Sequence, residues 1–279
     1  MSTAPATAFE ILIHMRRCDA LGPAGAIGLA LARRLDAWAV GMHVVPISPV
    51  AFASPEAVAM YVSEAEGVYR DALQCEPFWA GQLQAHGVRG EWRVNQGDTV
   101  ETLCQASRWS DFVVMQRPQL NPDAPTGWGV VSRTVFGASA PVVVVPEATA
   151  VDAPGRRIAV AWNRSRESAL AIRCALPLLA RADVVQVFEG LPGEDALGLQ
   201  HVPSLNLAPW LERRGIEAQF VAFPPRRGQG AALLDAAHAM SADLIVMGAW
   251  GHSRIAELVL GGTTRHLFQY SDLPLLVAH

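Results

Sequence analysis

Short apolar runs alternate with longer amphipathic segments along the whole chain. The C-terminal half contains five such runs, which we predict to be strands: 157–162, 183–188, 216–222, 242–247 and 274–278. Four segments lie between them, which we predict to be helices: 166–180, 203–214, 228–240 and 262–270. Strands that are apolar almost throughout are typical of a sheet covered by helices on both faces. The alternation predicts a parallel sheet with right-handed crossovers.

The N-terminal half repeats this pattern. Segment 9–46 is predicted to form a strand, a loop, a helix and a strand, and 156–192 has the same order at nearly the same lengths. The ends also correspond, because 110–146 parallels 242–279. A period of about 140 residues is too long for a solenoid and indicates two copies of one domain.

The join between the copies is the segment 146–156, "PEATAVDAPGR", whose Ala, Pro and Asp content is typical of a linker. We therefore predict domains at 1–149 and 150–279, each a doubly wound, five-stranded α/β domain. The last strand of each copy, at 142–145 and 275–278, is an apolar edge that needs a cover. We expect these two strands to run antiparallel side by side, which gives a monomer with pseudo-two-fold symmetry that can dimerise further.

The composition of the chain limits the partners that we expect for it. The chain has 279 residues, of which 51% are hydrophobic and 17% charged, and a formal net charge of −4. This mild acidity gives no electrostatic reason to expect a nucleic acid or an anionic membrane as partner. No apolar run reaches the roughly 18 residues of a membrane span, and no basic segment precedes the first apolar run. We expect a cytoplasmic location.

The lysine and cysteine content excludes or disfavours several kinds of site. The chain has no lysine, so it cannot form a Walker-type phosphate loop or a lysine Schiff base. Its four cysteines form no C-x-x-C pair, and we interpret them as small core residues rather than a disulfide framework or a zinc site: Cys18, Cys75, Cys104 and Cys174.

The glycine-rich segment 248–262, "GAWGHSRIAELVLGG", follows a predicted strand and precedes a predicted helix. One interpretation is a nucleophile elbow built on Ser253, but Ile255 stands where the elbow needs a small residue. A second is structural, because glycines supply turns and helix caps.

The third interpretation is a phosphate site. Gly248 and Gly251 would let backbone N–H groups turn toward an anion, and Gly261 and Gly262 would open a helix whose N-terminus attracts negative charge. The hydroxyls of the next two residues, 263–264, would add donors. The combined spacing favours this interpretation over the other two.

The pattern Gly248-x2-Gly251-x9-Gly261 resembles the nucleotide-binding signature of the universal stress protein family, and the duplicated chain resembles the tandem members of that family. The resemblance covers essentially the whole chain. It implies a fold like that of the adenine nucleotide α-hydrolases and ATP binding in the C-terminal domain, with or without Mg²⁺. It also implies a role in stress response through nucleotide-dependent regulation of an unknown protein client, without dedicated catalysis.

The resemblance also assigns residues to the nucleotide site. Asn163 stands where the family usually has an Asp near the nucleoside, and it could equally serve as a helix cap or turn residue. The backbone near Val187 would face the adenine. Gly262 follows the third glycine where ATP-binding members have Ser, Thr or Asn. The complete expected set is Ala161, Trp162, Asn163, Val187, Met247, Gly248, Gly251, His252, Gly261, Gly262, Thr263 and Thr264.

The N-terminal copy lacks this spacing. Gln116 corresponds to Gly248, Pro118 removes an N–H that a phosphate would need, and Arg16 stands where the second copy has Asn163. We predict that the first domain keeps the fold without the site. Two alternatives remain for the whole protein: a stress protein of this fold that binds no nucleotide and acts through protein contacts, and, more distantly, a serine hydrolase.

Overall fold

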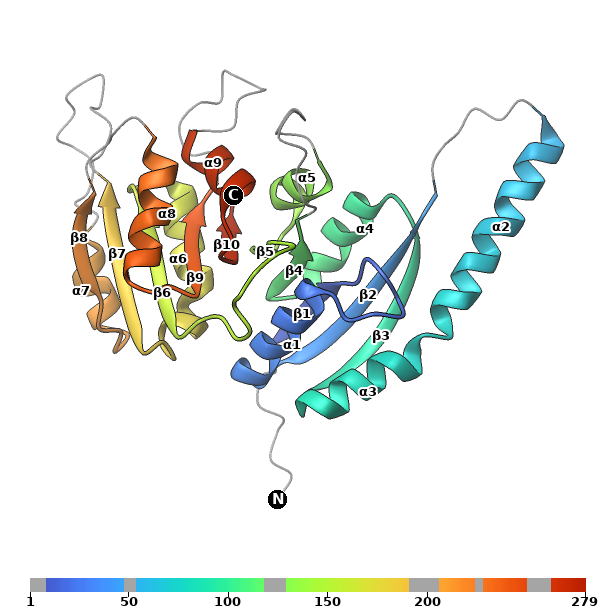
Figure 1. The fold of residues 1–279 in the computed structure, drawn as a ribbon, viewed down its shortest axis with the longest axis horizontal. Helices are drawn as coiled ribbons and strands as arrows, with labels where there is room; N and C mark the ends of the chain where they lie inside the picture. The colour runs from blue at the N-terminus through green and yellow to red at the C-terminus, as the bar shows by residue number, and fades with distance from the viewer. Residues whose placement is uncertain (1–8, 48–53, 118–128, 191–205, 224–227, 250–261) are drawn as a thin grey trace. The chain divides into compact units, whose positions relative to one another are not determined.

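The computed structural model describes residues 9–47, 54–117, 129–190, 206–223, 228–249 and 262–279 (Figure 1). The chain divides into two compact units. Among the described residues, the first unit comprises those up to Arg117 together with Gly129–Glu147, and the second comprises Ala148–His279.

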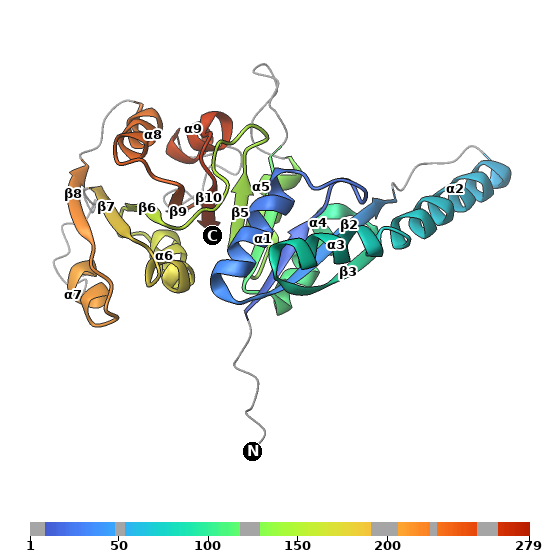
Figure 2. The same cartoon turned by 60° about the horizontal axis from the view of Figure 1, so that its bottom comes forward.

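The second unit contains a parallel sheet in the order β10-β9-β6-β7-β8. Its strands are β6 (Arg157–Trp162), β7 (Val184–Gly190), β8 (Gln219–Phe223), β9 (Leu244–Gly248) and β10 (Leu275–Ala278). Its helices are α6 (Arg166–Leu179), α7 (Leu207–Glu212), α8 (Gln229–Ala239) and α9 (Gly262–Tyr270). Helices α6 and α7 cover one face, and α8 and α9 cover the other (Figure 2). The predicted α/β class with a parallel sheet is confirmed.

Among the predicted strands of this unit, β8 differs most at its start: it begins at Gln219 although we predicted 216. Ile216 instead bonds back to the end of α7. Gly215 takes a left-handed conformation, with φ of 69°, and the N–H of Ile216 donates to the Leu211 carbonyl at 3.1 Å. Ile216 therefore caps the helix instead of pairing in the sheet.

The first unit has the equivalent parallel order, β3-β2-β1-β4-β5. Its strands are β1 (Glu10–His14), β2 (Trp38–Pro46), β3 (Arg89–Gly97), β4 (Phe112–Gln116) and β5 (Val142–Val145). Its helices are α1 (Pro23–Leu35), α2 (Pro55–Leu73), α3 (Glu76–His86), α4 (Thr99–Ala106) and α5 (Val130–Gly137), with a short 3₁₀ turn at Ser107–Trp109.

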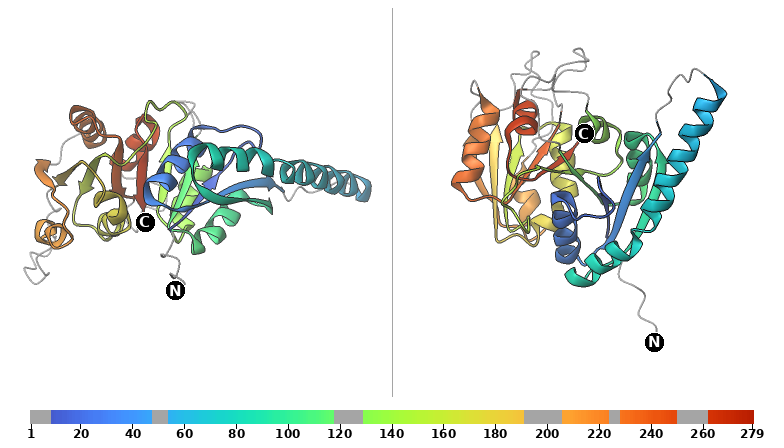
Figure 3. Two further views of the ribbon diagram at one scale, coloured as in Figure 1. Left: turned by 90° about the horizontal axis from the view of Figure 1, so that it is seen from below. Right: turned by 45° about the vertical axis from the view of Figure 1, so that its right-hand side comes forward.

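The connection between β2 and β3 distinguishes this unit. It contains two helices, and α2 extends well beyond the strands (Figure 3). Helix α3 is anchored by the indole of Trp79, which lies against Gly41 of β2 so closely that a β-carbon there would stand 2.6 Å from the ring. The end of α2 is tied to β3 by Trp92, whose Nε1 donates to the Ala72 carbonyl at 2.9 Å.

In both units, an aspartate just before a later strand accepts hydrogen bonds from the start of the first strand. The Asp243 carboxylate accepts from the three backbone N–H groups of residues 155–157, at 2.7, 2.9 and 3.0 Å. In the first unit, the Asp111 carboxylate accepts from the Glu10 N–H at 2.8 Å. This shared contact agrees with the internal repeat.

The four cysteines are not fully buried core residues as predicted, because each is partly exposed. In the part of the chain that the structure describes, no helix is long and apolar enough to cross a membrane. The side-by-side pairing of 142–145 with 275–278 stays a prediction.

Candidate functional site

The carboxyl ends of β6, β7 and β9 lie at one edge of the second unit's sheet. The chain runs from β6 to β7 and β8 on one side, whereas β9 and β10 lie on the other side of β6. Such a reversal in strand order leaves a crevice where doubly wound proteins bind ligands. Trp162 pairs with Glu189, so Asn163 and Gly190 come next to each other at this edge. A β-carbon at Gly190 would lie 3.7 Å from that of Asn163.

Asn163 makes the turn that leads into α6. Its Oδ1 accepts from the Ser165 N–H at 3.2 Å, and the Ser165 hydroxyl accepts from the Ser168 N–H at 3.1 Å as the helix cap. The turn role that the sequence left open for Asn163 is therefore confirmed. The side chain is exposed, and no described residue accepts from its Nδ2, so a ligand could still use that donor.

Gly248 is the last residue of β9, and the residue that approaches it most closely belongs to α6. A β-carbon at Gly248 would stand 2.4 Å from the Ser168 nitrogen and 2.5 Å from the Glu167 carbonyl carbon. These are backbone atoms of the first helical turn, which cannot move aside without unwinding it. The structural reason for this glycine is thus the packing of a helix on a strand end.

Two neighbouring residues of β6 face opposite sides of the sheet. Trp162 is 4% exposed and lines a pocket of about 290 Å³ on the α6–α7 face, together with Ala169, Ile172, Arg173, Asn206, Leu207, Trp210 and Arg213. Its Nε1 is buried without a hydrogen-bond partner in the described part of the chain. Ala161, by contrast, is partly exposed and faces the side of α8 and α9.

Two further residues of the expected set belong to the core. Val187 has 0% exposure and Met247 has 3%, so their side chains pack inside the sheet's helical layers. Val187 is not at a strand end as expected, because β7 continues to Gly190 and Val187 pairs with Val160 on one side and Phe220 on the other.

Helix α9 begins at Gly262, and its start is open. A β-carbon at Gly262 would meet no atom of the described residues within 4 Å, unlike one at Gly248. Thr263 is partly exposed, whereas Thr264 is 5% exposed and belongs to the packed side of the helix. Gly230 lets α8 and α9 pack closely, because a β-carbon at this position would stand 2.5 Å from the His266 β-carbon.

Sequence reasoning missed one charged pair at this edge. Arg164 follows Asn163 with a left-handed φ of 63°, which is uncommon for a residue other than glycine. Its guanidinium donates to the Glu189 carboxylate at the end of β7, at 3.1 Å. The pair joins the ends of two neighbouring strands, and only the register of β6 on β7 could have shown it.

Four candidate site residues that the sequence singled out lie outside the described residues: Gly251, His252, Ser253 and Gly261. Their place relative to Asn163 and Gly262 stays a prediction. Within the described residues, no group of three or more His, Cys, Asp or Glu side chains could hold a metal ion.

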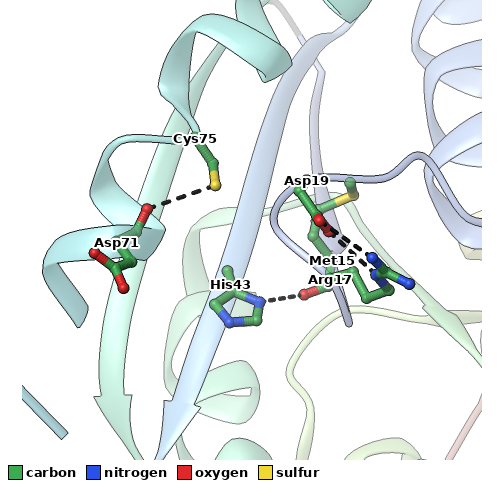
Figure 4. Close-up of polar contacts among 6 residues, drawn as sticks. All are labelled: Met15, Arg17, Asp19, His43, Asp71 and Cys75. Carbon is green, nitrogen blue, oxygen red and sulfur yellow. Dashed lines mark hydrogen bonds and ion pairs between the residues drawn. The ribbon is translucent and has the colours of Figure 1, made fainter. Parts of the chain in front are cut away.

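The corresponding edge of the first unit is chemically different. His43 of β2 contacts the Met15 carbonyl through Nδ1 at 2.8 Å, and the Arg17 guanidinium pairs with Asp19 at 3.1 Å (Figure 4). His14 ends β1 with a buried, unpartnered Nδ1. Burial, together with the neighbouring His43 and Arg16, lowers the pKa of His14 to about 4. The imidazole therefore stays neutral at neutral pH.

Gln116 ends β4 where Gly248 ends β9. Its side chain lies beside Gly22, the residue that caps α1, where an added β-carbon would stand 3.1 Å from Oε1 of Gln116. In the first unit, the small residue is thus on the helix and the large one on the strand. In the second unit, the arrangement is reversed.

The parallel sheet with its switch in strand order defines the second unit as a doubly wound α/β domain. Residues 155–279 match the model of the Universal stress protein family. This part of the chain is therefore a universal stress protein domain. No curated protein matches the chain at a significant level.

Solved structures extend the likeness to the whole chain. A universal stress protein from Archaeoglobus fulgidus DSM 4304 is 17% identical, with a TM-score of 0.73 over 98% of this chain and 99% of that chain. A putative universal stress protein from Pseudomonas aeruginosa UCBPP-PA14 is 14% identical, with a TM-score of 0.59 over 98% of this chain and 93% of that one. The chain therefore has the tandem fold of these proteins.

A shorter universal stress protein from Arabidopsis thaliana was solved with AMP bound. It is 17% identical and matches 50% of this chain and 92% of its own, with a TM-score of 0.33. This likeness is too low to inform the site in the present chain.

Proposed function

We propose that the second unit binds an adenine nucleotide, ATP, at the carboxyl edge of β6, β7 and β9, and that the protein acts as a nucleotide-dependent regulator rather than a dedicated enzyme. One observation carries this proposal: Gly262, the exposed first residue of α9, follows β9 in the chain, and β9 ends at the switch in strand order of a doubly wound sheet. The match of residues 155–279 to the universal stress protein family, one member of which was solved with AMP bound, supports it.

The phosphates would occupy the start of α9. A helix N-terminus carries about half a positive charge and unpaired N–H groups, and it binds anions without lysine. Among the described residues, no atom lies within 4 Å of a β-carbon at Gly262, so a phosphate would be able to reach the backbone there. The partly exposed Thr263 would add a hydroxyl donor.

The nucleoside would lie toward β6 and β7. Ala161 faces the α9 side of the sheet with a small, partly exposed side chain, which leaves room for a ring. The Nδ2 of Asn163 would donate to the ribose, and backbone groups at the end of β7, beyond Val187, would recognise the adenine edge. Since Asn163 has no charge, a Mg²⁺ ion would be bound mainly through the phosphates.

Calorimetric titration of the full chain with ATP tests the proposal. A micromolar site corresponds to about 8 kcal/mol. Gly262→Val should weaken ATP binding at least about a hundredfold by blocking the approach to α9. The fold should survive, because the added side chain meets no neighbour.

Gly67→Val is the matched control, because Gly67 is also a helical glycine with open space around it but lies in α2. It should bind ATP like the wild type. Unchanged binding by Gly262→Val would show that the assigned site is wrong. Absence of ATP, ADP and AMP binding by the wild type, and of copurified nucleotide in mass spectra, would overturn the proposed function itself.

The packing role of Gly248 favours one rival. The fold itself requires Gly248, so this glycine does not by itself indicate nucleotide binding. A protein that binds no nucleotide and acts through protein contacts would have it too. The titration separates the two. A serine-directed fluorophosphonate probe addresses the hydrolase alternative, since labelling of Ser253 would be needed to support it.

A further inference from the structure

The pocket on the α6–α7 face of the second unit plays no part in the proposed nucleotide site. Its volume is about 290 Å³, at the small end of the ~300–1,000 Å³ that is typical of ligand sites. Its lining comes from the end of β6, from α6 and from α7. The pocket therefore lies on the face of the sheet opposite to α9, where the phosphates would bind (Figure 2).

The interior of the pocket is apolar and aromatic. Trp162, Ile172 and Leu207 are buried, and the partly exposed Trp210 adds a second indole. The guanidinium of Arg214 lies 3.7 Å from the centre of the Trp210 ring, and its Nη1 donates to the Trp210 carbonyl at 2.9 Å. These contacts hold the second indole in place. Two indoles beside aliphatic side chains favour a flat apolar ligand.

The buried end of the pocket offers a hydrogen-bond donor. Trp162 is 4% exposed, and its Nε1 has no partner among the residues that the structure describes. An indole nitrogen can only donate, and a buried donor without an acceptor is unfavourable. A ligand oxygen that reaches this indole would satisfy it. The ligand should therefore carry an acceptor.

The outer part of the pocket is positively charged. Arg173 of α6 and Arg213, the residue that ends α7, belong to the lining, and both are exposed. Neither guanidinium forms an ion pair with a carboxylate in the described ranges. The described lining residues include no Asp or Glu. Because arginine stays charged and its planar donors match a carboxylate, the pocket favours an anion of this type.

We propose that this pocket binds a small aromatic carboxylate. The ring would lie among the side chains of Trp162, Ile172 and Trp210. A ligand oxygen would accept from the Trp162 Nε1, and the two arginines would attract the negative charge. A neutral hydrocarbon would satisfy neither the donor nor the guanidinium groups, and a cation would be repelled. A nucleotide would bring a ribose and a polyphosphate into a mainly apolar interior.

This assignment gives the Trp162 side chain a role different from the expected one. The family resemblance placed Trp162 in the nucleotide site, but its indole faces α6 and α7, whereas Ala161 faces α8 and α9. The two ligands would thus bind on opposite sides of β6. The inference does not depend on the proposed nucleotide function, and each can fail without the other.

A ligand-observed NMR titration of the full chain with 2-naphthoate tests the proposal, because this probe has a flat ring and one carboxylate. 2-Naphthamide has nearly the same shape without the charge, so it should bind at least about tenfold more weakly. Excess ATP should not displace the naphthoate. Gly262→Val should bind naphthoate like the wild type, since this change lies at the start of α9.

Paired variants test the polar groups. Trp162→Phe keeps a ring and removes the donor, so it should weaken naphthoate binding about tenfold. Its control is Trp109→Phe, because Trp109 is 82% exposed and lies in the first unit. Arg173→Gln should weaken binding about two- to fivefold, and less so at high salt. Arg133→Gln should have no effect, because it changes an exposed helical arginine of the first unit.

A variant that fills the pocket tests the location without changing the buried indole. Ala169 of α6 lines the pocket and is partly exposed, so Ala169→Leu should exclude naphthoate while the helix is kept. Circular dichroism checks that each variant folds. The proposal is overturned if the wild type does not bind naphthoate, if naphthamide binds equally well, if ATP displaces the probe, or if Ala169→Leu binds it like the wild type.

Discussion

Gly248 and Ser168 pack so closely that a β-carbon on Gly248 would stand 2.4 Å from the Ser168 backbone nitrogen. Real contacts of a β-carbon are not this short, so any larger residue must displace either β9 or the first turn of α6. That turn also carries the Ser165 cap, whose hydroxyl accepts from the same Ser168 N–H. The strand end and the helix start therefore form one packed unit, and its stability depends on the absence of a side chain.

The first prediction compares two glycines of the expected nucleotide site. Gly248→Ala should lower the free energy of unfolding by about 2–3 kcal/mol, because overpacking forces backbone shifts. Gly262→Ala should change it by less than about 1 kcal/mol, since its site is open and alanine favours a helix. Urea unfolding of both variants measures the difference. Equal effects would contradict the packing role of Gly248.

The second prediction concerns the aspartates at the strand starts. Asp243→Ala should destabilise the second unit by about 2–4 kcal/mol, because three backbone N–H groups lose a charged acceptor. Asp111→Ala removes only one such contact and should cost about 1 kcal/mol. Asp243→Asn keeps one acceptor oxygen and should fall between wild type and Asp243→Ala. Denaturant titration at fixed pH orders the three variants.

The third prediction is a pH dependence due to His14. Its pKa is lowered from 6.5 to about 4 in the folded state, so between these values the unfolded chain binds a proton that the folded one does not. Stability is therefore complete above pH 6.5 and falls as the pH drops toward 4. The loss attributable to His14 should be about 2 kcal/mol at pH 5.

Unfolding curves at pH 7.5 and pH 5 measure this change. His14→Gln cannot titrate, so the difference in stability between the two pH values should shrink by the same amount. An unchanged difference in the variant would show that another group causes the pH dependence.

The fourth prediction is the stoichiometry of nucleotide binding. Gln116 occupies the position of Gly248 in the first unit, and the loop after β1 there carries the Arg17–Asp19 pair instead of an open amide. We expect at most one ATP per chain. Calorimetry with a protein concentration fixed by amino-acid analysis gives the number directly, and a value of two would refute the prediction.

The periodic segments were predictable because their apolar patterns are strong. Strand 157–162 and helix 262–270 agree with β6 and α9 at both ends. The start of β8 was not predictable. Gly215 takes a left-handed conformation, and Ile216 therefore bonds to the end of α7 instead of pairing in the strand. Apolar residues look alike in both places, and only the backbone hydrogen bonds separate them.

The site was predictable in part. The sequence places Asn163 at the end of a strand and Gly262 at the start of a helix, but it does not show what each glycine contacts. Gly248 and Gly262 look equivalent in the pattern, yet the first is packed and the second is open. Contacts between distant segments, such as the ion pair of Arg164 with Glu189, depend on tertiary register and leave no local signal.

The different surroundings of the two glycines have an evolutionary consequence. Selection on folding alone would keep Gly248, so this residue would survive in a lineage that had lost its ligand. Gly262 meets no neighbour and would be free to drift once binding no longer mattered. In related chains, the residue at the start of the last helix is therefore the better marker of a retained ligand. In the first unit the small residue is Gly22 instead, so replacing Gln116 with glycine would leave a gap beside the start of α1.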